Sequence, residues 1–167
     1  RLKRRVEAGD AHAMYNLGFD YYRGEFGLPI DYNKAIELWL RAGELGNAAG
    51  HHNIAHAYST GQGVERDMKK SKHYSELAAM GGYVYARHNL GVVEGNAGNI
   101  SRAIKHFMIS AGAGYDDSLK RIREGYMKGH ATKNDFEKAL RAHKQAKDEM
   151  KSDRREEADA LYGQIYF

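Results

Sequence analysis

One short sequence pattern occurs four times in this chain, and it constrains the fold more than any other feature. Each copy places an aliphatic residue four positions after a small residue, and then places Asp or Asn three positions before Lys or Arg. The aliphatic anchors are separated by 37, 36 and 32 residues and are Leu17, Ile54, Leu90 and Ile122. A period of this length is typical of stacked helical repeats. Such arrays mostly bind other molecules and rarely catalyse reactions.

Each copy of the pattern predicts two helices. In the first copy, Ala13, Leu17 and Tyr21 recur every four residues, so they form one apolar stripe along a helix. Glycines end that helix, because glycine takes a positive φ at little cost. The second helix of each copy is expected to begin at a side chain that caps free backbone N–H groups, namely Asp31, Asp67, Asn99 and Asp135. We expect helices over residues 10–23, 32–45, 47–60, 68–80, 84–95, 100–112, 116–128 and 133–150.

The repeats also predict the domain organisation. Residues 1–8 match the end of an upstream helix, and four repeats follow over 9–46, 47–82, 83–114 and 115–150. Repeat three has a short, tetratricopeptide-like loop at 95–98, and Glu94 replaces the aromatic residue of the other copies. Residues 151–167 are predicted to form a capping helix, with Ala158, Leu161 and Ile165 on one face. An array needs such a cap because its last apolar face would otherwise contact water.

Composition narrows the possible partners. The chain has 42% hydrophobic and 29% charged residues, and a single Pro permits long helices. No run of about 18 apolar residues is present, so we expect no membrane partner. The absence of Cys excludes disulfides and cysteine-type zinc sites. The net charge is +4, but the basic residues are spread over helix faces and form no continuous stripe, so we expect no nucleic-acid partner. The compartment stays open, with the cytoplasm favoured.

Repeats one and two resemble the Sel1-like repeat family, a relative of the tetratricopeptide repeats. The matching blocks are Leu-Gly-x2-Tyr-x2-Gly at 17–24, Asp-x2-Lys-Ala at 31–35 and Gly-Gln-Gly-Val at 61–64. The resemblance implies an all-α, right-handed solenoid of antiparallel helix pairs, whose first helices form a concave face for protein partners. It also implies an adaptor role, since Sel1-like proteins often serve as adaptors in ubiquitin-linked degradation and in signalling complexes.

The first helices supply a candidate binding surface. Positions five and two residues before each anchor, and two and five after it, share one helix face. They are His12, Tyr15, Phe19 and Tyr22 in repeat one, His52, His56 and Ser59 in repeat two, and Tyr85, His88 and Val92 in repeat three. We expect an extended peptide or a helix to bind there, because rigid aromatic side chains are frequent interface anchors. The alternative is that several of them, Phe19 and Val92 first, pack against a neighbouring helix.

Histidines offer an alternative function as metal ligands. His52 and His56 are one helical turn apart, and His88 takes the place of His52 in the next repeat. Imidazoles on one helix face can chelate Zn or Ni. Equivalent positions on stacked helices are about 10 Å apart, however, which is too far for shared coordination. We therefore expect no metal and no other cofactor, and favour a pH-sensitive groove instead.

Enzyme motifs and one peptide-binding motif are missing. The chain has no phosphate loop, no His-Glu-x2-His and no Gly-x-Ser-x-Gly. A tetratricopeptide carboxylate clamp needs cationic side chains, but those positions are Tyr15, Phe19, Tyr85 and Asn89. We predict a scaffold or adaptor that binds a protein or peptide, is no enzyme and forms part of a larger protein. Self-association through residues 1–6 or 162–167 is a second alternative, so the oligomeric state stays open.

Overall fold

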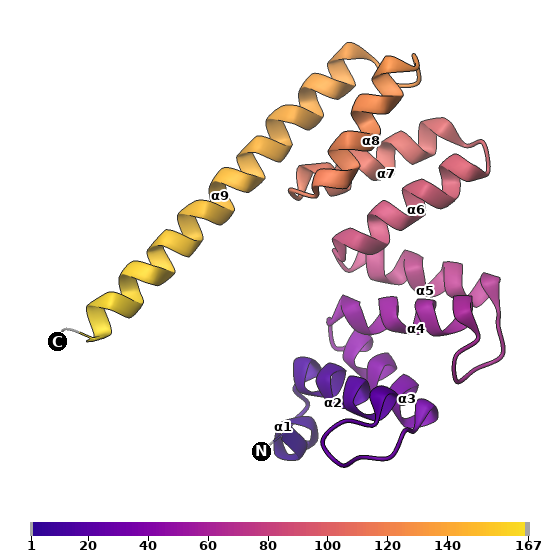
Figure 1. Cartoon of the computed structure of the whole chain (residues 1–167), viewed down its shortest axis with the longest axis vertical. Coiled ribbons are helices and arrows are strands. Elements are labelled where there is room, and N and C mark those ends of the chain that lie inside the picture. The colour runs from indigo at the N-terminus through magenta and orange to yellow at the C-terminus, as the bar shows by residue number, and fades with distance from the viewer. Residues whose placement is uncertain (1, 166–167) are drawn as a thin grey trace. The chain divides into compact units, whose positions relative to one another are not determined.

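Residues 2–165 are described by the computed structural model, and every regular element among them is an α-helix (Figure 1). The predicted all-α class is therefore confirmed. The chain forms two compact units, Arg1–Leu90 and Gly91–Phe167. The side chains of Asp159 and of residues 161–165 lie outside the description. Within the described part, no helix is both long enough and apolar enough to cross a membrane.

The first unit consists of paired helices, as the repeats predict. Its elements are α1 (Leu2–Glu7), α2 (Ala11–Arg23), α3 (Tyr32–Glu44), α4 (Ala48–Thr60), α5 (Met68–Met80) and the first half of α6 (Val84–Asn96). Helix α2 packs against α3, α4 packs against α5, and α3 also contacts α4, which joins one pair to the next. The observed ends agree with the predicted ranges to within one residue.

The repeated anchors form the core of this unit. Leu17 packs with Met14 and Leu38, while Ile54 packs with Ala35 and Trp39. Ile54 and Trp39 are only 1% and 2% exposed. These contacts confirm that the stripe identified from the sequence is the buried face of the first helices.

Glycine permits the close approach of successive helices. Gly18 of α2 faces the Trp39 indole, and a Cβ at Gly18 would lie 2.7 Å from the indole Nε1. The same indole N–H donates a hydrogen bond to the carbonyl of Tyr15 at 3.2 Å. A Cβ at Gly50 of α4 would overlap the carbonyl oxygen of Trp39 in α3. Gly18 therefore sets the spacing between the two helices of repeat one, and Gly50 sets the spacing between repeats one and two.

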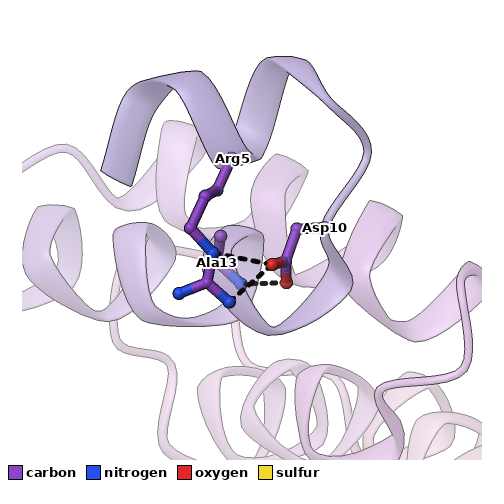
Figure 2. A network of polar contacts seen from close by, with 3 residues as sticks. All are labelled: Arg5, Asp10 and Ala13. Atoms are coloured by element: carbon purple, nitrogen blue, oxygen red, sulfur yellow. Dashed lines mark hydrogen bonds and ion pairs between the residues drawn. The ribbon is translucent and has the colours of Figure 1, made fainter. Parts of the chain in front are cut away.

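Aspartates cap the helices of the first unit. Asp31 and Asp67 accept hydrogen bonds from backbone N–H groups of α3 and α5, which confirms these two predicted caps. Asp10 caps α2 through the N–H of Ala13 at 2.9 Å and also binds the Arg5 guanidinium of α1, with Nε–Oδ2 at 2.8 Å (Figure 2). The Ala13 N–H and then Arg5 hold the pKa of Asp10 below its usual value. This network ties α1 to the start of α2.

The second unit packs three helices around its own core. After the second half of α6 come α7 (Ile100–Gly112), α8 (Asp116–Met127) and α9 (Lys133–Ile165). Ile122 is fully buried and clusters with Phe107 and Ala139. Arg123, which follows the anchor where repeat one has Gly18, is exposed.

Asn99 occupies the predicted N-cap position of α7, but the predicted capping by its side chain is wrong. Its side chain makes no capping hydrogen bond, and Nδ2 instead donates to the carboxylate of Glu94 at 2.8 Å. Glu94 is 8% exposed and occupies the position of Tyr21 and Tyr58 in repeats one and two. A buried carboxylate requires hydrogen-bond donors, so it draws the Asn99 amide away from the helix terminus.

The predicted cap at Asp135 is also wrong, because α9 begins two residues earlier. Thr132 is the capping residue. Its Oγ1 accepts from the Asp135 N–H at 3.1 Å, and the Asp135 carboxylate accepts from the Thr132 N–H at 3.0 Å. This reciprocal pair is a capping box, in which each side chain satisfies a backbone donor of the other.

The predicted separate capping helix over 151–167 is wrong for residues 151–165, which continue α9 without a break. The physical reason is composition: between residues 133 and 162 the chain contains no Gly and no Pro, so nothing interrupts a run of good helix formers. Figure 1 shows α9, in yellow, as a helix much longer than α8. The side chains of Leu161 and Ile165, assigned to the cap face, lie outside the described residues.

Candidate functional site

The N-terminal half of α2 exposes a row of rings. His12 is exposed, and its ring stacks on Tyr15 with centroids 6.2 Å apart. Tyr15 is half-buried and in turn contacts Phe19, with centroids 6.3 Å apart. These contacts follow from the spacing of three and four residues, which places the three side chains on one side of the helix.

The other end of the stripe on α2 turns toward α3. Tyr22 lies 5.1 Å from Trp39 and 5.3 Å from Tyr32, measured between ring centroids. Its hydroxyl is buried and has no hydrogen-bond partner among the described residues. Phe19 contacts Trp39 at 6.4 Å. Tyr22 and part of Phe19 thus pack inside repeat one. For Phe19, packing against a neighbouring helix was the alternative to partner binding that the sequence left open.

A residue that sequence reasoning missed joins the stripes of α2, α4 and α6. Tyr83, directly before α6, has its ring 4.8 Å from His52 of α4 and 5.6 Å from Tyr85 of α6. It also lines a hollow together with His12 of α2, and Tyr15 of α2 contributes to the raised pKa of Tyr83. We call His12, Tyr15, His52, Tyr83 and Tyr85 the aromatic patch. The sequence could have identified Tyr83 from its place in the repeat, since a Gly-Tyr pair stands at the same place in the next repeat, at Gly114 and Tyr115.

A hollow of about 460 Å³ adjoins the aromatic patch. His12 and Tyr83 line two of its sides. The turn between α3 and α4, residues 45–49, and the glycines 81 and 82 before Tyr83 complete it. Small residues in these segments leave the space open, so the hollow beside the patch is shallow and faces solvent.

The remaining candidate residues lie around the aromatic patch or away from it. His56 is exposed on α4, and the hydroxyl of Ser59 donates to its carbonyl at 2.8 Å. His88 is half-buried on α6. Val92 belongs to the second unit, where it packs beside the Phe107 cluster, as the packing alternative foresaw.

Burial favours the uncharged forms of two members of the aromatic patch, His52 and Tyr83. Burial lowers the pKa of the His52 imidazole, and the neighbouring His56 lowers it further. Burial, followed by Tyr15 and Tyr85, raises the pKa of Tyr83. Both shifts favour neutral rings at physiological pH, so the patch offers apolar faces together with imidazole and hydroxyl hydrogen-bonding groups.

The metal alternative has no geometric support in the described part of the chain. No three side chains of His, Cys, Asp or Glu come together there in a way that could hold a metal ion. His52 instead directs its ring to Tyr83. The spacing of His52, His56 and His88 therefore does not produce a ligand set.

Paired helices with anchors at corresponding positions define the molecule as an all-α helical repeat protein. The chain belongs to the Sel1 repeat family, whose sequence pattern matches residues 11–47, 48–83 and 124–146, more than half of the chain. The repeat boundaries at 9–46 and 47–82 stay predictions, as do the boundaries of repeats three and four.

Known proteins share the repeat and the fold. The ERAD-associated E3 ubiquitin-protein ligase component HRD3B of Arabidopsis thaliana is 29% identical over 106 residues, which cover 63% of this chain and 16% of that protein. Among solved structures, a Sel1 repeat protein from Oxalobacter formigenes superposes with a TM-score of 0.72 at 26% identity, over 88% of this chain and 62% of that one. The protective antigen c5321 of uropathogenic Escherichia coli gives 0.71 at 26% identity, over 89% and 32%. The chain thus spans about a sixth of the HRD3B relative's length.

Proposed function

We propose that this chain is a protein-interaction module, and that its aromatic patch holds an extended peptide or a helix of a partner protein. The observation that carries the proposal is that His12 and Tyr83 line one hollow, while Tyr15 stacks with His12, and His52 and Tyr85 are in ring contact with Tyr83. Rings from three helices thus surround one hollow. Tyrosine supplies large contact area at low conformational cost and is enriched where binding energy concentrates.

The exposure of the patch residues also supports a role in partner binding. Tyr85 is 52% exposed and His12 is also exposed, although a folded chain gains free energy by burying apolar rings. The adjoining hollow of about 460 Å³ gives a partner side chain room to enter. A surface with rings at its centre and a depression beside it fits the hot-spot arrangement of protein interfaces.

The setting that we propose is a larger assembly, with the catalytic activity, if there is one, in other chains or segments. The Arabidopsis relative is described as a component of an ERAD-associated E3 ubiquitin-protein ligase. We propose an adaptor role in a ubiquitin-ligase assembly for this chain as well. Repeat arrays suit that task because they present extended surfaces without using their core.

Affinity capture tests the proposal. The intact chain and the double variant His12→Ala/Tyr85→Ala serve as baits, and bound proteins are quantified by mass spectrometry. The matched control is His130→Ala/Tyr126→Ala, which removes the same two residue types from exposed positions in the second unit. We expect specific partners, ubiquitin-ligase subunits among them, to be lost with the patch variant and kept with the control. Equal recovery by all three baits would refute the proposal.

A further inference from the structure

A second hollow lies on α2 next to the aromatic patch and differs from it in charge. Its volume is about 420 Å³. Its walls come from α1, from one face of α2 and from the loop after α2, and the lining residues are Leu2, Tyr15, Asn16, Phe19, Asp20 and Phe26. Three of these side chains are aromatic and one is a carboxylate, so the hollow combines ring faces with a negative charge.

Phe26 is placed in this hollow at a cost. It is 87% exposed and has φ 54, the left-handed region that bulky residues rarely adopt. The loop residues on either side are ordinary, since Gly24 and Gly27 take positive φ freely. Folding alone gives no reason to hold a large ring in water in a strained conformation. An outlier of this kind indicates that the ring serves a contact with another molecule.

Asp20 carries a carboxylate that has no counter-ion among the side chains that the structure describes. Its side chain is half-buried, and within the described residues no ion pair or hydrogen bond reaches its carboxylate. Burial raises the pKa of Asp20, and the nearby Glu25 raises it further. Arg23, three residues further along α2, is engaged with the Glu25 carboxylate at 3.5 Å. A cation entering the hollow would therefore relieve an existing electrostatic cost.

One ring of this hollow, Phe19, already contacts a cation from within the chain. The guanidinium carbon of Arg23 lies 4.4 Å from the centroid of Phe19. Attraction between a guanidinium and the face of an aromatic ring strengthens when both are shielded from water. The remaining ring surfaces of Tyr15, Phe19 and Phe26 offer the same interaction to a second cation.

Comparison with the next repeat excludes a closely packed apolar helix as the occupant. Thirty-seven residues after Asp20, the equivalent position on α4 is Ala57, which is fully buried in the stack of repeats. Stacking thus requires a small apolar side chain there. In repeat one this position is Asp20, whose carboxylate has no partner in the described part of the chain. An apolar helix packed against it would leave that charge buried and unpaired.

We propose that this hollow receives a cationic side chain, Arg or Lys, of the partner, with Asp20 as its counter-ion and Tyr15, Phe19 and Phe26 as the walls around its apolar stem. The inference rests on the proposed function, since Tyr15 belongs both to the hollow and to the aromatic patch. It adds the chemistry of the partner: a basic segment that crosses α2.

NMR titration of the isotope-labelled chain tests the inference directly. The probe is the blocked peptide acetyl-Gly-Arg-Gly-amide, and its neutral counterpart carries citrulline, which keeps the shape of Arg without the charge. We expect the Arg peptide to shift the amide resonances of residues 15–20 and 26, and to bind at least 5-fold more tightly than the citrulline peptide. Asp20→Asn should remove that preference.

Asp153→Asn is the control variant, since it makes the same substitution at an exposed position of α9. It should bind both peptides as the parent chain does. Equal affinity for the two peptides, or an unchanged preference in Asp20→Asn, overturns the inference. If that happens while the patch variant still loses its captured partners, the proposed function stands and only the cationic site is refuted. If the Arg preference holds but capture is unchanged, the site stands and the aromatic patch is refuted.

Discussion

Replacing Gly50 by Ala tests the packing between repeats one and two more directly than deleting a core side chain. Gly50 is the point where α4 approaches α3. A Cβ there would overlap the carbonyl oxygen of Trp39 and lie 3.1 Å from the backbone N of Gly43. Both contacts are backbone atoms of α3, so no change of rotamer can relieve them, and the two helices must move apart.

The magnitude follows from two opposing terms. Overpacking a close helix contact costs about 1–3 kcal/mol, and immovable backbone neighbours favour the upper half of that range. Exchanging Gly for Ala in a helix returns at most about 1 kcal/mol. We expect a net loss of about 1–2 kcal/mol. For a unit of this size, each kcal/mol lowers the Tm by about 4–8 °C.

Trp39 is the only tryptophan of the chain and lies at the same contact, so its fluorescence reports the unfolding of this unit. Urea titrations of the parent and Gly50→Ala, followed by Trp39 emission and by circular dichroism, give the two free energies of unfolding. The control is Gly95→Ala on α6, where the nearest atom to the new Cβ is Ala103 Cβ at 3.6 Å, an ordinary contact. It should be neutral or stabilising. A Gly50→Ala midpoint equal to that of the parent would refute the assigned approach of α3 and α4.

Two further predictions concern the core and the link between α8 and α9. Ile54→Ala should cost about 2–5 kcal/mol by thermal denaturation, because Ile54 is 1% exposed and its loss leaves a cavity; a melt like that of the parent would show that the anchor is not buried. Asp116 accepts from Lys147 at 3.0 Å and from His143 at 2.7 Å, and these two partners lower its pKa. The stability that the Asp116 carboxylate contributes is therefore present above its unfolded pKa of about 3.9 and is lost as the pH falls through its lower folded pKa. The urea midpoint of Asp116→Asn should therefore differ from that of the parent at pH 6, and the two midpoints should converge in acid. A gap that is constant with pH would contradict this.

The repeat period made most of the fold predictable. Because Leu17, Ile54 and Ile122 recur in phase with the glycines and the capping acids, each local signal agreed with the others. The errors arose where a single residue broke the repeat. Glu94 redirected Asn99, and Thr132 took over the cap from Asp135. The repeat pattern predicts the same capping hydrogen bond at every equivalent position. Whether that bond forms depends on the side chains that surround the capping residue in its own repeat.

The candidate site was less predictable than the core. The helix face was identified from spacing, but spacing does not distinguish a ring that packs inward, such as Tyr22, from one that faces solvent, such as Tyr85. Tyr83 was missed because it precedes its helix and lies outside the periodic stripe. Asp20 was missed for a different reason: its unpaired charge is a property of the folded surroundings and cannot be read from a helical pattern.

The length of α9 has a mechanical consequence. Its first half is anchored, with Ala139 buried and Met150 against Gly114, whereas residues 151–157 are exposed on every side. At 1.5 Å per residue, the fifteen residues from 151 to 165 form an arm about 22 Å long. Since the side chains of residues 151–157 are not buried against a neighbouring helix, amide exchange should be faster there than along the anchored half of α9. The rigidity of α9 should therefore decrease from residue 139 toward residue 157.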